Sequence, residues 1–130
     1  MHWIVDAMNV IGSRPDGWWR DRHAAMVRLV DRLERWASRV NDEVAANDDV
    51  TVVFESKPHP RITSSVIVVA HAPRARANSA DDEILRLVRA HPNPMAVRVI
   101  TSDHGLADAV RAEGATVEPS EPFRGRIDPA

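Results

Sequence analysis

The sequence predicts an α/β fold with a mainly parallel central sheet and helices on both of its faces. Two patterns indicate this fold. Short runs rich in β-branched residues alternate along the chain with longer segments whose apolar residues recur every three or four positions. The short runs are almost continuously apolar, as expected of strands that are covered on both faces. Because open parallel sheets bind ligands at the carboxyl ends of their strands, we expect a functional site there.

The first half of the chain is expected to contain two strands and one long helix. The apolar run at residues 3–5 predicts a buried strand that stops at Asp6, and the turn-forming residues that follow predict a loop. Residues 19–40 place apolar side chains at spacings of three and four, with arginines on the opposite face, which predicts an amphipathic helix. Residues 50–54 are a β-branched run that predicts the second strand.

The second half of the chain continues the alternation. A β-branched run at residues 66–69 predicts the third strand. A loop that carries arginines then leads into a helix, which is expected to begin at the N-cap Ser79 and to end before Pro92. The remaining elements are expected to be a strand, a short helix and a last strand, at residues 96–100, 105–111 and 115–117.

Length and composition narrow the protein class. The chain has 130 residues, of which 44% are hydrophobic and 28% charged, a composition typical of globular proteins. Its longest apolar run is Val66 to Ala70, whereas a membrane-spanning helix needs about 20 residues. With no cysteine and no visible export signal, we expect a cytoplasmic protein that does not enter a membrane. We expect one domain over residues 1–118 and, because of its prolines, an extended tail over residues 119–130.

Three acidic residues fall where a parallel sheet collects ligands. Asp6 ends the first strand, Asp103 ends the fourth, and Asp81 lies in the first turn of the helix between them. If the first and fourth strands are neighbours, about 4.8 Å apart, Asp6 and Asp103 can share one cation. A hard divalent ion such as Mg²⁺ or Mn²⁺ would relieve the repulsion between these carboxylates. Asn9 adds an amide suited to a water molecule or a phosphate oxygen.

Each acid also has a purely structural interpretation. Asp81 and Asp82 both suit the first turn of a helix, and Asp82 has the spacing of a capping box with Ser79. Asp81 differs because it shares the apolar stripe of its helix. Asp103 is equally well explained as a helix N-cap, and Asp6 as a turn residue. The coincidence of three such acids favours a shared function.

Three motifs, in this order, resemble a known family. They are Asp6-Ala7-Met8-Asn9 after a strand, Ser79-Ala80-Asp81-Asp82-Glu83-Ile84 at the start of a helix, and Ile100-Thr101-Ser102-Asp103 at a later strand end. Together they resemble the NYN domain of the PIN-like nuclease superfamily, and most of all its YacP-like group of small bacterial ribonucleases. The resemblance covers roughly residues 3–117.

This resemblance implies a PIN-like, Rossmann-like three-layer α/β/α sandwich and metal-dependent cleavage of RNA. Asp6, Asp81 and Asp103 would hold Mg²⁺ or Mn²⁺, and Asn9 would position water or the phosphate. The sequence departs from the family pattern at Glu55, where many relatives have aspartate. Further acids are available at two positions: Asp82, which favours a structural role, and Asp108, whose spacing from Asp103 favours a solvent-facing position.

An acidic centre needs nearby cations to accept RNA. Arg74 and Arg76 directly precede the helix of Asp81 and are the first candidates for phosphate contacts, together with Arg14 after the first strand. Trp18 and Trp19, flanked by Arg14, Arg20 and Arg22, would either stack an unpaired base or pack the following helix against the sheet. Among the histidines, His104 is worth testing because it adjoins Asp103.

Two functions are compatible with these residues. The first is a metal-dependent endoribonuclease that acts on single-stranded or ribosome-associated RNA and leaves a 5′-phosphate and a 3′-hydroxyl. The alternative is a catalytically inactive RNA- or ribosome-binding module of the same fold. The set of three acids favours the enzyme, because a pure binder gains nothing from repelling phosphates. A receiver-like phosphotransfer domain is disfavoured, since Asp6 has no acidic neighbour and Lys57 is the only lysine.

Overall fold

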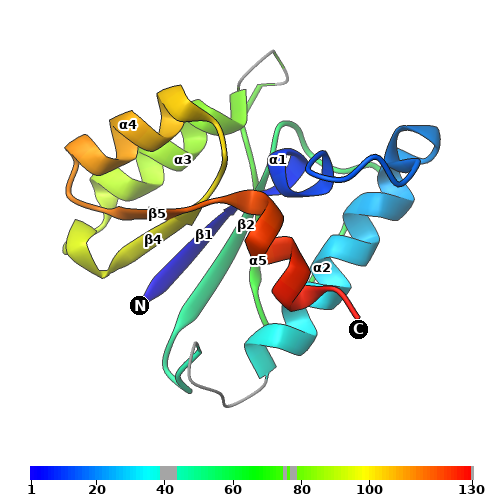
Figure 1. Ribbon diagram of the computed structural model, residues 1–130, viewed down its shortest axis with the longest axis horizontal. Coiled ribbons are helices and arrows are strands. Elements are labelled where there is room, and N and C mark those ends of the chain that lie inside the picture. The colour runs from blue at the N-terminus through cyan, green and yellow to red at the C-terminus, as the bar shows by residue number, and fades with distance from the viewer. Residues whose placement is uncertain (39–43, 75, 77–78, 130) are drawn as a thin grey trace.

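A computed structural model describes residues 1–38, 44–74, 76 and 79–129. Within these residues, five strands form one sheet in which all neighbouring strands run parallel (Figure 1). The order across the sheet is β3-β2-β1-β4-β5. The strands are β1 (His2–Asp6), β2 (Asp49–Phe54), β3 (Val68–His71), β4 (Val97–Ile100) and β5 (Thr116–Glu118). The chain therefore starts in the centre of the sheet, builds one side, and crosses back to build the other.

Helices cover both faces of the sheet (Figure 1), which confirms the predicted three-layer α/β/α architecture. Successive side chains of a strand point to opposite faces, so Trp3 and Val5 join one core while Ile4 joins the other. The first core is closed by α1 (Ala7–Ile11), α2 (Arg22–Ser38) and α5 (Ser120–Ile127). The second is closed by α3 (Ser79–Ala90) and α4 (His104–Ala112). Two 3₁₀ turns complete the fold, η1 (Trp18–Arg20) and η2 (Pro94–Ala96).

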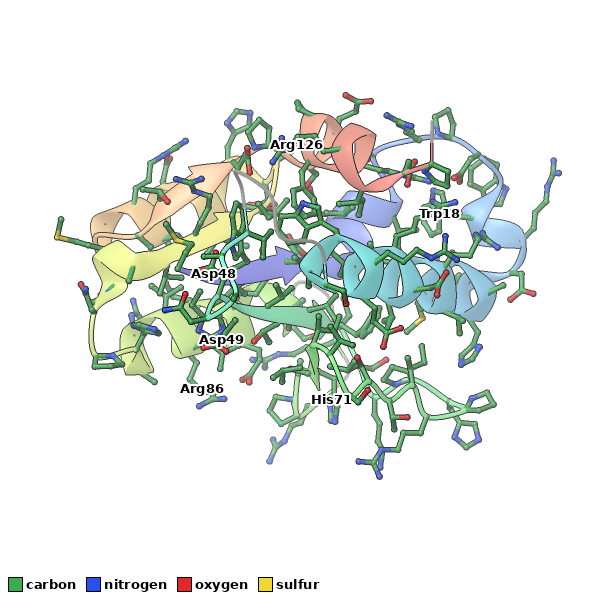
Figure 2. The ribbon with its side chains drawn as sticks, turned by 90° about the horizontal axis from the view of Figure 1, so that it is seen from below. Trp18, Asp48, Asp49, His71, Arg86 and Arg126 are labelled. Carbon is green, nitrogen blue, oxygen red and sulfur yellow. The ribbon has the colours of Figure 1, made fainter. Side chains whose placement is uncertain are left out.

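Asp48 ties the amino ends of β1 and β2 together. Its carboxylate accepts hydrogen bonds from the N-terminal amine at 3.1 Å and from the Trp3 indole at 3.4 Å. Figure 2 shows Asp48 and Asp49 side by side at the start of β2. The amino ends of these two strands are thus held together by one carboxylate.

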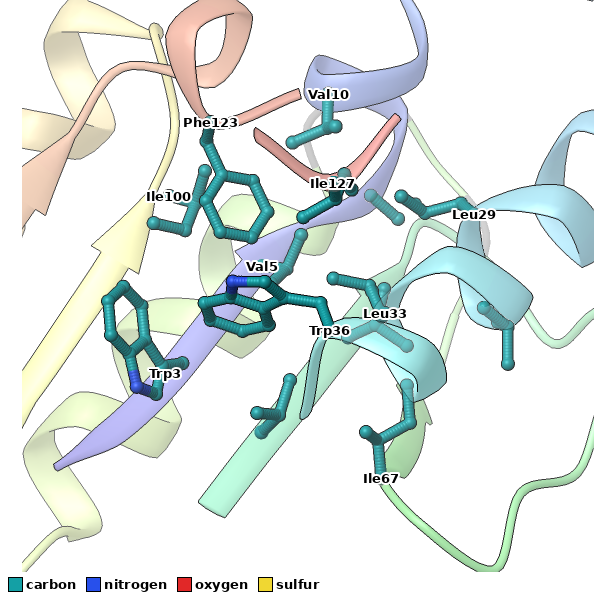
Figure 3. Packing of buried hydrophobic residues seen from close by; sticks show 14 of the residues in the cluster. Trp3, Val5, Val10, Leu29, Leu33, Trp36, Ile67, Ile100, Phe123 and Ile127 are labelled. Atoms are coloured by element: carbon teal, nitrogen blue, oxygen red, sulfur yellow. The ribbon is translucent and has the colours of Figure 1, made fainter. Parts of the chain in front are cut away.

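An aromatic cluster forms the centre of the larger core (Figure 3). The ring of Trp36 on α2 meets Trp3 edge-on at 5.0 Å and Phe123 on α5 at 5.1 Å, measured between ring centroids. All three side chains are buried. Such edge-to-face pairs add to the stabilisation gained from burial alone. The C-terminal helix is therefore part of the core.

The extended tail predicted for residues 119–130 is wrong over residues 120–127, which form α5. Pro119 occupies the N-cap position and Pro122 lies in the first turn, where backbone N–H groups have no partner within the helix and proline is tolerated. Phe123 and Ile127 then stand one turn apart and face the core. The prolines mark the start of a helix here.

Other elements agree with the sequence to within a few residues. The helix expected over residues 19–40 spans 22–38, and positions 39–40 lie outside the described residues. The third strand is shifted two residues along the chain. The loop expected after Asp6 is wrong at residues 7–11, which form α1.

No helix in the described part of the chain combines the length and apolarity that a bilayer crossing requires.

Replacing Phe123 with alanine is expected to lower the free energy of unfolding by about 3–5 kcal/mol, the usual cost of removing a buried aromatic ring. Met95→Ala is the matched control, because its side chain is 77% exposed and its loss should change stability by less than about 0.5 kcal/mol. Urea unfolding followed by circular dichroism measures both variants. Equal stability of the two would contradict the role of α5 in the core.

Candidate active site

A pocket opens at the carboxyl ends of the central strands. Because β1 and β4 are direct neighbours, with Val5 opposite Ile100, the residues that follow them meet at the same edge of the sheet. The pocket has a volume of about 340 Å³. Its lining residues are Asp6, Met8, Asn9, Trp18, Arg22, Glu55, Asp81 and Asp103. The structure thus brings together the three predicted acids and Asn9, and adds Glu55.

Asp6 is the most deeply buried acid of this pocket. It ends β1, is 5% exposed, and its Oδ2 accepts a hydrogen bond from the Thr101 hydroxyl at 2.9 Å. Burial raises the pKa of Asp6 to about 7, and the nearby carboxylates of Asp81, Asp103 and Glu55 raise it further, against the opposing effect of Thr101. Asp6 is therefore held in a place that disfavours its charged form.

Asp81 and Asp103 reach the pocket from two helices. Burial raises the pKa of Asp81, and the carboxylate of Asp103 contributes to the same shift. Asp103 is the N-cap of α4, since its Oδ1 accepts a hydrogen bond from the Leu106 N–H at 2.8 Å. The two interpretations of Asp103 are thus compatible: one oxygen caps the helix while the side chain also lines the pocket.

Asn9 is clamped by residues from two other segments. Its Oδ1 accepts hydrogen bonds from the Ser102 N–H at 2.9 Å and from the Ser120 hydroxyl at 2.6 Å. Ser102 and Ser120 are themselves joined, because the Ser102 hydroxyl accepts from the Ser120 N–H at 2.9 Å. A backbone N–H can only donate, so the amide oxygen must face it and the NH₂ group of Asn9 is left outside this network. Sequence reasoning missed both serines, and Ser120 stood in the expected tail.

Several other predicted residues lie outside the pocket lining. Asp82 is exposed and pairs with Arg76 at 3.0 Å, and Asp108 is exposed and lies 3.8 Å from Arg111. His104 begins α4 and does not line the pocket either. The predicted capping box is wrong, because the Ser79 hydroxyl donates instead to the carbonyl of Glu55 at 2.6 Å.

The arginines predicted to meet phosphate are also placed elsewhere. Arg74 and Arg76 line a separate hollow of about 180 Å³ beside the start of α3. Arg14 pairs with Glu121 at 3.0 Å and with Asp128 at 3.1 Å, so it holds α5 in place. The arginine that does line the acidic pocket is Arg22.

The donor set fits a hard divalent ion in type. The pocket offers four carboxylates, the ligands that Mg²⁺ and Mn²⁺ prefer. The positions of these side chains do not yet form an ion site. Among the described residues, no three acidic or histidine side chains are placed so that they could hold one ion together. Asp6 and Asp103 each use one oxygen for an internal hydrogen bond and keep the other for a ligand. Side-chain rotation would therefore have to accompany binding of the ion.

A family model for the YacP-like NYN domain matches residues 3–130 of the sequence. This chain belongs to the YacP-like NYN domain family. The match spans all three motifs, Asp6 to Asn9, Ser79 to Ile84 and Ile100 to Asp103, and it extends through α5. The family is nuclease-like, in agreement with the resemblance drawn from these motifs.

Solved structures agree with this family in fold. The crystal structure of Rae1 (YacP) from Bacillus subtilis matches with a TM-score of 0.77 and 21% identity, over 98% of this chain and 73% of that one. Its W164L mutant matches with a TM-score of 0.73 and 22% identity, over 98% and 74% of the two chains. No curated protein matches the sequence.

The raised pKa of Asp6 predicts how the stability of the metal-free protein depends on pH. The native state holds this proton up to about pH 7, whereas the unfolded chain loses it near pH 3.8. The stability contributed by protonated Asp6 is therefore complete below about pH 4 and is lost as the pH rises through 7. Asp6→Asn keeps an oxygen for Thr101 and removes the charge.

In EDTA, the free energy of unfolding of Asp6→Asn is expected to rise relative to that of the wild type as the pH increases from 4.5 to 8. The rise is at most about 4 kcal/mol, the limit set by the difference between the native and unfolded pKa values of Asp6. Urea unfolding of both proteins across this range measures the difference. A difference that stays constant with pH would contradict the buried position of an ionising Asp6.

Proposed function

We propose that this chain is a metal-dependent endoribonuclease that hydrolyses RNA phosphodiester bonds at the acidic pocket. The observation that carries the proposal is the gathering of four carboxylates from four segments of the chain around one opening. Burial raises the pKa of Asp6 and the neighbouring carboxylates raise it further, so gathering these acids in one place opposes folding. Perturbed carboxylates in a cleft are typical of functional sites.

The chemistry follows from the residue types. Mg²⁺ or Mn²⁺, when held by Asp6, Asp81 and Asp103, would supply a Lewis acid for the phosphate and lower the pKa of a water molecule. Asn9 has its amide oxygen fixed by Ser102 and Ser120, so its NH₂ group is the part free to donate to a phosphate oxygen. Glu55 lines the same pocket and can accept a hydrogen bond from water at its rim.

The positions of the acids also support a phosphodiester substrate. They lie at the strand ends where the chain order of the sheet reverses, between β1 and β4, the usual ligand-binding place of such sheets. The nuclease-like family and the shared fold support the same assignment. We take single-stranded RNA, free or on a ribosome, as the substrate class.

Purified protein is expected to cut end-labelled single-stranded RNA in Mn²⁺ or Mg²⁺ and to leave it intact in EDTA. Asp103→Asn should lower the cleavage rate at least about 100-fold, because it replaces one of the three charged ligands proposed to hold the metal ion with a neutral one. Asparagine caps helices as well as aspartate does, so the variant should remain folded. Asp108→Asn is the control, since it removes the same charge from the exposed face of the same helix.

Cleavage in EDTA, or equal rates for Asp103→Asn and the wild type, would contradict the proposal. RNA binding without any cleavage would support the inactive binding module instead.

A further inference from the structure

Arg22 is a positive charge set into the wall of the acidic pocket. Of the described residues that line this pocket, it is the one base. Its guanidinium carbon lies 5.3 Å from the centre of the Trp18 ring, a cation–π contact. No carboxylate of the described chain pairs with it, whereas Arg14, Arg76 and Arg86 each form an ion pair. Arg22 is therefore free to bind an anion from outside.

The indole that Arg22 contacts, that of Trp18, is itself in contact with a second indole, that of Trp19. Trp18 packs partly against the core and also lines the pocket, at the turn that precedes α2 (Figure 2). Trp19 meets it edge-on, with the ring centroids 5.9 Å apart, and is 50% exposed. Packing explains Trp18 in part, but it does not explain a tryptophan with half of its surface in water.

The turn that carries these three residues is constrained at both of its ends. Gly17 has a φ of 86°, a left-handed conformation that other residues rarely adopt, and its carbonyl accepts from the Arg20 N–H at 3.0 Å. Asp21 then caps α2, since its Oδ1 accepts from the Ala24 N–H at 3.0 Å. The backbone that carries the indoles and Arg22 is therefore fixed at both ends, which lowers the backbone entropy lost on binding.

We propose that Trp18, Trp19 and Arg22 form a subsite for one unpaired nucleotide of RNA. The base stacks on the exposed ring of Trp19, which Trp18 supports edge-on. Arg22, over the Trp18 ring, binds the phosphate next to that base, on the side of the acidic pocket. A stacked base needs a free face, and sequence-tolerant stacking on aromatic side chains is how single strands are commonly bound. This proposal rests on the proposed function. It adds how the site would recognise single-stranded RNA, by stacking one unpaired base beside the cleavage site.

Binding can be measured without turnover. The full chain in EDTA is titrated into fluorescein-labelled single-stranded octauridylate, and Kd is read from anisotropy at several salt concentrations. Arg22→Gln is expected to weaken binding about 3- to 10-fold and to reduce the slope of log Kd against log salt by about 0.7, the value for one phosphate contact in a single strand. Arg28→Gln, an exposed arginine on the same helix that does not line the pocket, should change neither.

The indoles are tested in the same assay. Trp19→Ala should weaken binding by about 5- to 100-fold, the range for one lost base stack, and Trp19→Phe should retain most of the affinity. RNA should quench the tryptophan fluorescence of the wild type and quench Trp19→Ala less. Duplex RNA of the same length should bind at least about 10-fold more weakly than the single strand, because its bases are paired.

Equal effects of Arg22→Gln and Arg28→Gln, equal affinity for the duplex, or no RNA binding by the wild type would each overturn the subsite. A wild type that shows these binding effects yet cuts no RNA in Mn²⁺ would contradict the proposed nuclease while supporting the subsite. The two proposals therefore fail separately.

Discussion

Four carboxylates are gathered at one edge of the sheet, and the surrounding structure must hold them there against burial and their mutual repulsion. Asp6 bears most of this cost: burial is the main cause of its raised pKa, and the neighbouring carboxylates add to it because little water screens them. The Thr101 hydroxyl offsets part of the cost. The rest of this free-energy cost is offset by packing elsewhere in the fold. Two apolar cores, one on either side of β1, hold the end of that strand in position.

The C-terminal helix links the core to the pocket. Phe123 contacts Trp36 in the aromatic cluster, and three residues earlier Ser120 donates to Asn9 in the pocket wall. Arg124, 7% exposed, donates to the carbonyl of Ile11 at 2.7 Å and pairs with Asp16. One short helix therefore fixes α1, the loop before η1 and the orientation of a predicted catalytic amide.

The sequence predicted the features that depend on periodicity and on strand ends. Continuous β-branched runs predict the parallel strands, and the rule for strand ends predicts that Asp6, Asp81 and Asp103 lie near one another. It failed where tertiary contacts decide. Pro119 and Pro122 suggested an extended tail because nothing local reveals that Phe123 meets Trp36.

The arginines expected to contact phosphate lie outside the lining of the acidic pocket. Arg14 adjoins the first motif along the chain, but it pairs with Asp128, which comes close only in the folded protein. Arg76 pairs with Asp82, six residues further along the chain. In the sequence Arg22 stands out only as a neighbour of the tryptophans, and its place in the pocket wall depends on the tertiary fold. The ligand arrangement of an ion was likewise beyond a sequence, since it depends on side-chain rotamers.

The central claim, that these carboxylates hold a divalent ion, is tested most directly by calorimetric titration of Mn²⁺ into the EDTA-stripped protein. Because Asp6 must lose its proton to bind, the account predicts binding that is up to about 10-fold tighter at pH 8 than at pH 6. Asp81→Asn should lose this binding, while Asp82→Asn, the adjacent acid outside the pocket lining, should keep it. Absence of Mn²⁺ binding by the wild type, or equal binding by the two variants, would contradict the account.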